Sequence, residues 1–120
     1  MDILSTLKRE HREVAQLIDE VNECEAGDER LRALAQEIEQ RLSVHMKLEE
    51  QLFYPELRDR AENSEELVEM YEAFTEHAAA KSLIEMVESG KKPDEQFKAE
   101  LQVLGESIKH HVKEEESKVF

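Results

Sequence analysis

Two segments of the chain carry the same motif, a histidine followed four residues later by a glutamate. They are His45 with Glu49 and His111 with Glu115, and a second glutamate follows each motif. The offset from 45 to 111 is 66 residues. Without any gap, the same offset relates these further pairs: His11 and His77, Glu10 and Glu76, Leu17-Ile18 and Leu83-Ile84, Val21 and Val87, Asp28-Glu29 and Asp94-Glu95, Lys47 and Lys113, and Glu50 and Glu116. The chain is therefore two copies of one unit, and the copies are expected to fold alike.

The spacing of apolar residues predicts that each copy is a pair of helices. Apolar side chains recur in alternating steps of three and four along four stretches, which marks one face of an α-helix in each. The predicted helices span about residues 2–25, 29–55, 64–89 and 94–119. Helix-ending and helix-capping residues stand between them, at Gly27-Asp28, at Asn63-Ser64, and at Gly90, Pro93 and Asp94. We expect Pro55 to end or kink the second helix.

Four helices joined by mostly short links predict an all-α fold. They favour an up-down-up-down antiparallel four-helix bundle that is built from two repeated helical hairpins. A chain of 120 residues has room for one modest core, so we expect residues 1–120 to form a single domain. Gly105 interrupts the last helix at a cost of about 1 kcal/mol relative to alanine. A close contact between helices is our interpretation of this glycine.

Six ionisable side chains fall within the predicted apolar stripes. At about 1.5 Å per residue, antiparallel helices place the four histidines at one height and the two glutamates one turn away. The six residues are His11, His45, Glu49, His77, His111 and Glu115. Carboxylates are almost never fully buried without a partner, and bound cations would neutralise this layer. Imidazole and carboxylate donors suit iron, manganese or zinc, and two ions that share both carboxylates would keep open coordination positions.

A second interpretation of the same layer involves no metal. Hydrogen bonds between histidines and glutamates would then form a polar layer that sets the register of the helices. Without a cation, we expect Glu49 and Glu115 to repel each other or to take up protons.

The charge balance restricts the classes of partner. Lysine and arginine number 16 against 30 aspartates and glutamates, a net charge of −14, which disfavours nucleic acid and anionic membrane surfaces. The N-terminal segment has no apolar run long enough for a signal peptide or a membrane span. The single Cys24 has no second cysteine for an internal disulfide. These features predict a cytoplasmic protein.

The motifs resemble those of the hemerythrin-like, or HHE, family. His11, "HMKLEEQLFYP", "EHAAAK" and "HHVKEEESKVF" match the family pattern in order over essentially the whole chain. The resemblance implies a non-haem centre of two iron ions, joined by an oxo or hydroxo bridge. It implies that the six residues of the polar layer are the metal ligands, with Glu49 and Glu115 as bridges. It also implies a small ligand such as O2, NO or peroxide.

The chain departs from the oxygen carriers of that family at two places. The carriers have a second histidine four residues after the third-helix histidine, where this chain has Lys81. They have an aspartate five residues after the last histidine, whereas this chain has Glu115, four residues after His111. Reversible oxygen carriage is therefore not the expected function.

Two metal-dependent functions remain open at this stage. The first is a di-iron protein that reacts with or senses O2, NO or peroxide, and an oxidoreductase or peroxidase-like activity would belong to it. The second is an iron-sensing or regulatory module without redox turnover of its own. A plain helical bundle that mediates protein contacts is a third hypothesis, and metal content would separate it from the other two.

Other polar residues near the stripes have secondary expectations. His110 points away from the stripe and is expected on the surface. Glu50 and Glu116 are surface residues or supports for the metal ligands. Lys81 either reaches solvent or aims its ammonium group at an anion on the metals. Tyr71 either fills the core or supplies a hydroxyl above the site.

Overall fold

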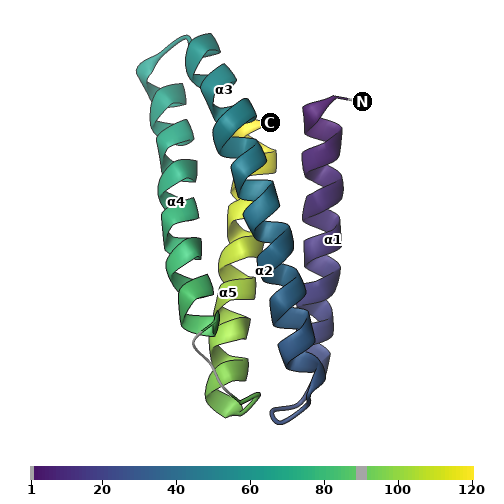
Figure 1. Ribbon diagram of the computed structural model, residues 1–120. Coiled ribbons are helices and arrows are strands. Elements are labelled where there is room, and N and C mark those ends of the chain that lie inside the picture. The colour runs from purple at the N-terminus through teal and green to yellow at the C-terminus, as the bar shows by residue number, and fades with distance from the viewer. Residues whose placement is uncertain (1, 89–91) are drawn as a thin grey trace.

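The computed structural model describes residues 2–88 and 92–120, and this part of the chain forms four antiparallel helical rods (Figure 1). The first rod is α1 (Ile3–Glu23), and the third is α4 (Ser64–Glu88). The second rod joins α2 (Arg30–Leu48), the π-helical segment η1 (Glu49–Phe53) and α3 (Tyr54–Arg60). The fourth joins α5 (Glu95–Glu114) and the π-helical segment η2 (Glu115–Val119). The predicted all-α, up-down-up-down four-helix bundle is confirmed. None of the described helices is long and apolar enough to cross a membrane.

Local sequence signals begin and end the rods. Asp2 accepts a hydrogen bond from the Ser5 amide at 2.8 Å, and Asp94 accepts one from the Phe97 amide at 3.0 Å, so both act as N-caps. Asn63 accepts from the Glu66 amide at 2.9 Å at the start of α4. Gly27 adopts a φ of 94°, the left-handed conformation that suits a glycine after a helix. The predicted turn residue Gly90 and the predicted helix end at residue 89 lie outside the described residues.

The two π-helical segments obey the sequence repeat. The segment η1 covers residues 49–53 and η2 covers 115–119, which are the same five positions of the two copies. Each segment begins at a glutamate of the polar layer. A π-helical turn carries one extra residue and recurs at functional sites, where it changes the direction of side chains within a continuous helix.

Pro55 does not end the second rod, which was one of the two outcomes expected from the sequence. It lies in the first turn of α3, and the rod continues to Arg60. The wide turn of η1 directly precedes it, with the Tyr54 amide bonded to the Glu49 carbonyl. A proline is tolerated in a first helical turn because the amide that it lacks has no partner there in any case.

Two apolar clusters fill the bundle, and the polar layer lies between them. The larger cluster packs all four rods together in the half of the bundle that contains Val21, Leu31 and Phe97. The smaller cluster contains Leu7 and Tyr54 and lies toward α3. The polar layer is therefore shielded from water on both sides along the bundle axis.

Gly105 allows α5 to approach α1 closely, as the sequence suggested. A β-carbon added at Gly105 would lie 2.8 Å from the Cγ2 methyl group of Ile18. That methyl group is attached directly to a branched β-carbon, so it cannot swing aside. We expect Gly105→Ala to lower the free energy of unfolding by about 1–2 kcal/mol, because overpacking outweighs the better helix propensity of alanine.

Urea denaturation of a double-mutant cycle tests this contact. In an Ile18→Ala background, which lacks the methyl group, Gly105→Ala should cost little or should stabilise the protein. An equal cost in both backgrounds would show that the close approach does not explain the glycine.

Candidate metal centre

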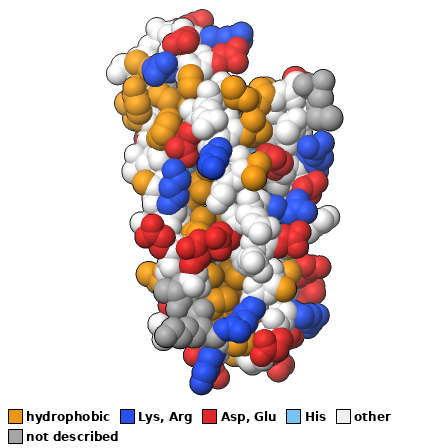
Figure 2. Space-filling view, in the orientation of Figure 1, with side chains coloured by type: hydrophobic (Ala, Val, Ile, Leu, Met, Phe, Trp, Pro, Cys, Tyr) orange, Lys and Arg blue, Asp and Glu red, His pale blue; other side chains and the backbone are white. Residues whose placement is uncertain are grey.

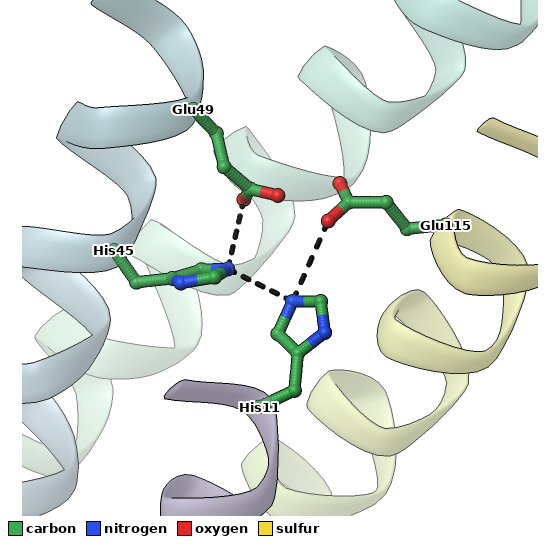
Figure 3. Close-up of side chains that lie close together, drawn as sticks. All are labelled: His11, His45, Glu49 and Glu115. Atoms are coloured by element: carbon green, nitrogen blue, oxygen red, sulfur yellow. Dashed lines mark hydrogen bonds and ion pairs between the residues drawn. The ribbon is translucent and has the colours of Figure 1, made fainter. Parts of the chain in front are cut away.

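The fold brings the six residues of the polar layer into two adjoining groups. The first cluster is His11, His45, Glu49 and Glu115, shown in Figure 3. The second cluster is Glu49, His77, His111 and Glu115. Both glutamates belong to both clusters and are fully buried, with 0% and 1% exposure for Glu49 and Glu115. Each cluster thus takes two histidines from one hairpin and one glutamate from each hairpin.

The distances within the clusters suit a metal ion. Two donor atoms that lie at right angles about 2.1 Å from one ion are about 3.0 Å apart. The Nε2 atoms of His11 and His45 are 2.9 Å apart, and His45 Nε2 lies 3.2 Å from Glu49 Oε1. In the second cluster, His77 Nε2 lies 3.0 Å from Glu49 Oε1, and His111 Nε2 lies 3.3 Å from Glu115 Oε2. The side chains are therefore already spaced as ligands of a common ion.

Three buried atoms of the described side chains lack a hydrogen-bond partner, and all three belong to the clusters. They are Glu49 Oε2, Glu115 Oε1 and His111 Nε2. A buried polar atom without a partner costs about 1–3 kcal/mol, and more when it is charged. A cation in each cluster would satisfy these atoms together, so the residues present fit a pair of metal ions.

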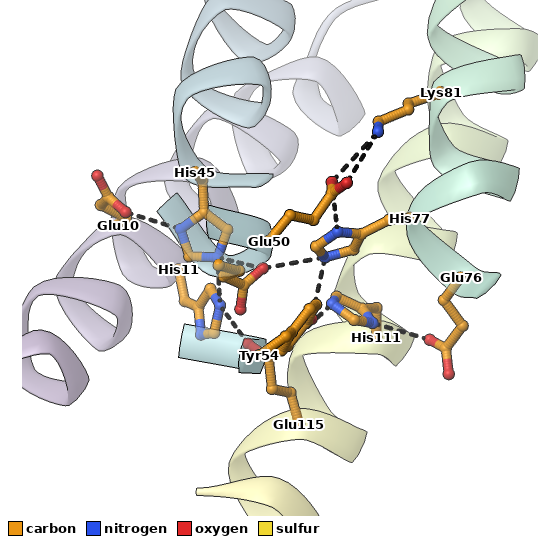
Figure 4. A network of polar contacts seen from close by, with 11 residues as sticks. Glu10, His11, His45, Glu50, Tyr54, Glu76, His77, Lys81, His111 and Glu115 are labelled. Atoms are coloured by element: carbon orange, nitrogen blue, oxygen red, sulfur yellow. Dashed lines mark hydrogen bonds and ion pairs between the residues drawn. The ribbon is translucent and has the colours of Figure 1, made fainter. Parts of the chain in front are cut away.

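Each histidine of the clusters is held from behind by a further glutamate, and Figure 4 shows the glutamates that hold His45, His77 and His111. An ionised carboxylate accepts hydrogen bonds but cannot donate one. Nδ1 of each ring therefore donates, and Nε2 keeps its lone pair for a cation. The four Nδ1–carboxylate pairs are His11 with Glu116 at 2.6 Å, His45 with Glu10 at 2.7 Å, His77 with Glu50 at 3.1 Å, and His111 with Glu76 at 3.0 Å. These outer carboxylates orient all four rings toward the shared centre.

The sequence left two alternatives for Glu50 and Glu116, the surface or a supporting role, and the contacts with His77 and His11 agree with the second. It gave no role to Glu10 and Glu76. Their signal was present, because both stand directly before a histidine and obey the 66-residue offset. The sequence could not show the partners of these two glutamates, because each bonds a histidine on the neighbouring helix rather than the histidine that follows it in sequence.

Tyr54 is a polar residue of the site that the sequence did not reveal. Tyr54 is fully buried, and its hydroxyl donates to Glu115 Oε2 at 2.6 Å. The hydroxyl oxygen of Tyr54 also lies 3.1 Å from His77 Nε2. Burial, followed by the Glu49 and Glu115 carboxylates, raises the pKa of Tyr54 well above its ordinary value, so the hydroxyl stays protonated. The ring also lines an open cleft of about 500 Å³ between α3 and α4. Hydrophobic side chains gather over this part of the surface in Figure 2.

Three residues for which the sequence gave expectations lie at the surface. His110 is exposed, as predicted. Tyr71 is 54% exposed, so it does not fill the core, and it lines the open cleft together with Tyr54. Lys81 is half exposed, and its ammonium group bonds both oxygens of Glu50 at 3.2 and 3.3 Å. The ammonium group is therefore directed at the outer carboxylate rather than at the clusters.

A family model of the hemerythrin HHE cation-binding domain matches residues 2–120, which is the whole chain apart from its first residue. The chain belongs to the hemerythrin HHE family. Comparisons with curated proteins and with solved structures give no match. For this HHE domain, the histidine and glutamate groups can hold a metal ion, and the fold places them at the centre of the bundle.

In this HHE domain the Tyr54 hydroxyl lies beside His77 in the second cluster, 3.1 Å from its Nε2 atom. The sequence gave no such signal, because Phe120 matches Tyr54 at the repeat offset and has no hydroxyl. Phe120 instead stacks on the His11 ring, with centroids 5.8 Å apart and 12° between the planes.

The electrostatics of the protein groups differ from the sequence-based expectation. Burial alone would lower the pKa of His111, but Glu115, Glu49 and Glu76 raise it to about 9. Burial would also lower the pKa of His45, but Glu49 and Glu10 outweigh this effect and raise the pKa. Burial would raise the pKa of Glu115, yet the contacts with His11 and His111 hold it far below its usual range. Without a cation, protons are therefore held on His45 and His111 rather than on Glu115.

These shifts predict how the chelated HHE domain responds to pH. A raised histidine pKa contributes stability that is complete below about pH 6.5 and is lost as the pH rises through about 9 for His111. The lowered pKa of Glu115 contributes stability above about pH 4.5 and is lost at lower pH. Chelated protein should be most stable near pH 5–6 and should lose about 2 kcal/mol by pH 9.

Thermal melts with and without metal, at pH 6, 7.5 and 9, measure this effect. Metal must displace the imidazole protons, so the stabilisation by metal should increase with pH. His110→Gln is the matched control, because this histidine is exposed and should leave the pH profile unchanged. A chelated protein whose melting temperature rises between pH 6 and 9 would contradict the assignment of protons to His45 and His111.

Proposed function

We propose that this protein binds two iron ions in a non-haem di-iron centre and reacts with or senses small oxidants or gases. One ion is held by the first cluster and one by the second. The observation that carries the proposal is that Glu49 and Glu115 belong to both clusters, which is the arrangement of two bridging carboxylates. The six ligands are His11, His45, Glu49, His77, His111 and Glu115.

The set of donor atoms fits iron and differs from that of a structural zinc site. Four imidazoles and two carboxylates lack the multiple thiolates of a structural zinc site, and Cys24 lies in the larger apolar cluster away from the layer. Two histidines and two shared carboxylates give each ion fewer than six protein donors. Iron bound with such free positions supplies binding and redox chemistry for O2, NO or peroxide.

A small cavity beside the histidines supports a ligand of this size. It has a volume of about 30 Å³ and touches all four histidines of the clusters. On the side of the larger apolar cluster, its walls include Val14, Leu42, Ala80 and Ile108. One water molecule needs about 10–15 Å³ of such space, so the cavity suits a molecule of two or three non-hydrogen atoms. Apolar walls favour a gas or a neutral peroxide over a charged substrate.

The protein's own groups orient and protect this centre. The outer carboxylates fix the four rings, and the Tyr54 hydroxyl fixes Glu115 through its hydrogen bond at 2.6 Å. Because its pKa is raised, Tyr54 remains a hydrogen-bond donor and can hold a proton beside His77. Lys81 neutralises Glu50 at the outer edge.

Metal analysis of protein purified without chelator tests the proposal. We expect about two iron ions per chain and absorption bands of an oxo- or hydroxo-bridged ferric pair. His111→Ala should lose at least half of the iron, whereas the neighbouring His110→Ala should keep it, because His110 lies on the surface. Full occupancy with zinc, one ion per chain, or equal losses in both variants would contradict the proposal.

A second candidate is an iron-sensing or regulatory module without redox turnover. The observation that favours it is that the ligands come from all four rods, so metal binding and bundle packing are linked. Anaerobically reduced, iron-loaded protein mixed with O2, NO or peroxide separates the two functions. A spectral change within seconds supports the first, and repeated consumption of peroxide would make the protein an enzyme. No reaction, together with a large loss of melting temperature on chelation, supports the second.

A further inference from the structure

The two hairpins differ where the histidine clusters approach the surface. A narrow cavity of about 20 Å³ lies between α4 and α5, and its inner end is formed by His111 and Glu115. His111 is the most exposed of the four cluster histidines, with 13% of its side chain accessible against 3–6% for the others. The site is therefore closest to solvent along this one side of the bundle.

Carboxylates line this cavity from the surface inward. Glu69, Glu72 and Glu114 stand at its outer part, and Glu76 lies beside His111, with its carboxylate 3.0 Å from Nδ1 (Figure 4). Lys118 is the one cation among its lining residues and bonds Glu114 at 2.8 Å. Glu114, followed by Glu72 and Glu69, raises the pKa of Lys118. The surroundings therefore favour a positive charge at the mouth of the cavity.

The inner end of the cavity belongs to the second cluster. Glu115 Oε1 and His111 Nε2 are buried atoms without a hydrogen-bond partner, and both of their side chains line the cavity. Glu115 itself is 1% exposed. A row of surface acids alone would be an ordinary solvated face. Here the row ends at two donors that are unsatisfied by the protein.

The first hairpin lacks the same row of acids. At the repeat offset of 66, Glu69 corresponds to Ile3, Glu72 to Thr6, Glu114 to Leu48 and Lys118 to Leu52, and only Glu76 is kept, as Glu10. Ile3 and Leu48 pack against the smaller apolar cluster, so the equivalent approach to His45 is covered by apolar side chains. The acidic lining is thus confined to one copy, although the clusters themselves follow the repeat.

We propose that the cavity between α4 and α5 is the uptake route by which a divalent cation, such as Fe²⁺, reaches the two clusters. The inference rests on the proposed metal-binding function and adds a path to it. Carboxylates at the walls of a narrow opening concentrate cations and raise their association rate by about 10 to 1,000-fold. The ion is attracted by the carboxylates of Glu69, Glu72 and Glu114, where it replaces the ammonium group of Lys118. The first ligands that it meets are His111 and Glu115.

Stopped-flow uptake of Co²⁺, followed by its visible absorption, tests the route in chelated protein, and Fe²⁺ uptake under anaerobic conditions repeats the test. The double variant Glu72→Gln with Glu114→Gln should bind metal about tenfold more slowly at low salt, with equal final occupancy. The difference should shrink as salt screens the carboxylates. Lys118→Met should accelerate uptake, because it removes the competing ammonium group.

Glu85→Gln with Glu106→Gln is the matched control. It removes the same charge from exposed residues of the same two helices, away from the cavity, and should leave the rate near that of the unmodified protein. Equal slowing in both double variants, or no slowing in either, would overturn the route while leaving the metal site intact. Failure of the unmodified protein to take up either metal would overturn the proposed function as well.

Discussion

The burial of two carboxylates at the centre of the bundle is the constraint on which the rest of the structure depends. Glu49 and Glu115 have almost no contact with solvent, and isolated charges in such a place cost several kcal/mol each. The protein surrounds them with four imidazoles and one tyrosine hydroxyl, and then places four further carboxylates behind the imidazoles. The charges therefore alternate from the centre outward, from the buried carboxylates to the imidazoles and then to the outer carboxylates.

This alternating layer also explains the shape of the rods around it. The helices change to π-helical geometry at Glu49 and again at Glu115, at equivalent positions of the two copies. Apolar clusters on both sides of the layer exclude water and strengthen each electrostatic contact within it. The close approach of α1 and α5 at Gly105 belongs to the larger cluster, and it holds two of the ligand-bearing helices together.

Much of this could be predicted from the sequence because its signals are periodic. The helical stripe and the 66-residue offset together placed His11, His45, His77 and His111 at one level, and the structure brings them together. The passage of the helix beyond Pro55 could not be predicted, since it depends on a π-helical turn that has no simple sequence pattern. Tyr54 was missed for a different reason: its role depends on hydrogen bonds across the bundle, and repeat comparison pairs it with a phenylalanine.

The outer carboxylates show how contacts between helices escape a one-dimensional comparison. Glu10 and Glu76 were visible as a conserved pair of the internal repeat, but their partners His45 and His111 lie 35 residues further along the chain. Glu50 and Glu116 bond histidines of the opposite hairpin, His77 and His11.

The internal duplication has a consequence for how such a site can change over time. Two identical hairpins joined as a dimer would have to alter both halves of the site with every substitution. Because both copies stand in one chain, a tyrosine, a lysine or a row of acids can be acquired beside one cluster alone, and the two clusters are free to diverge.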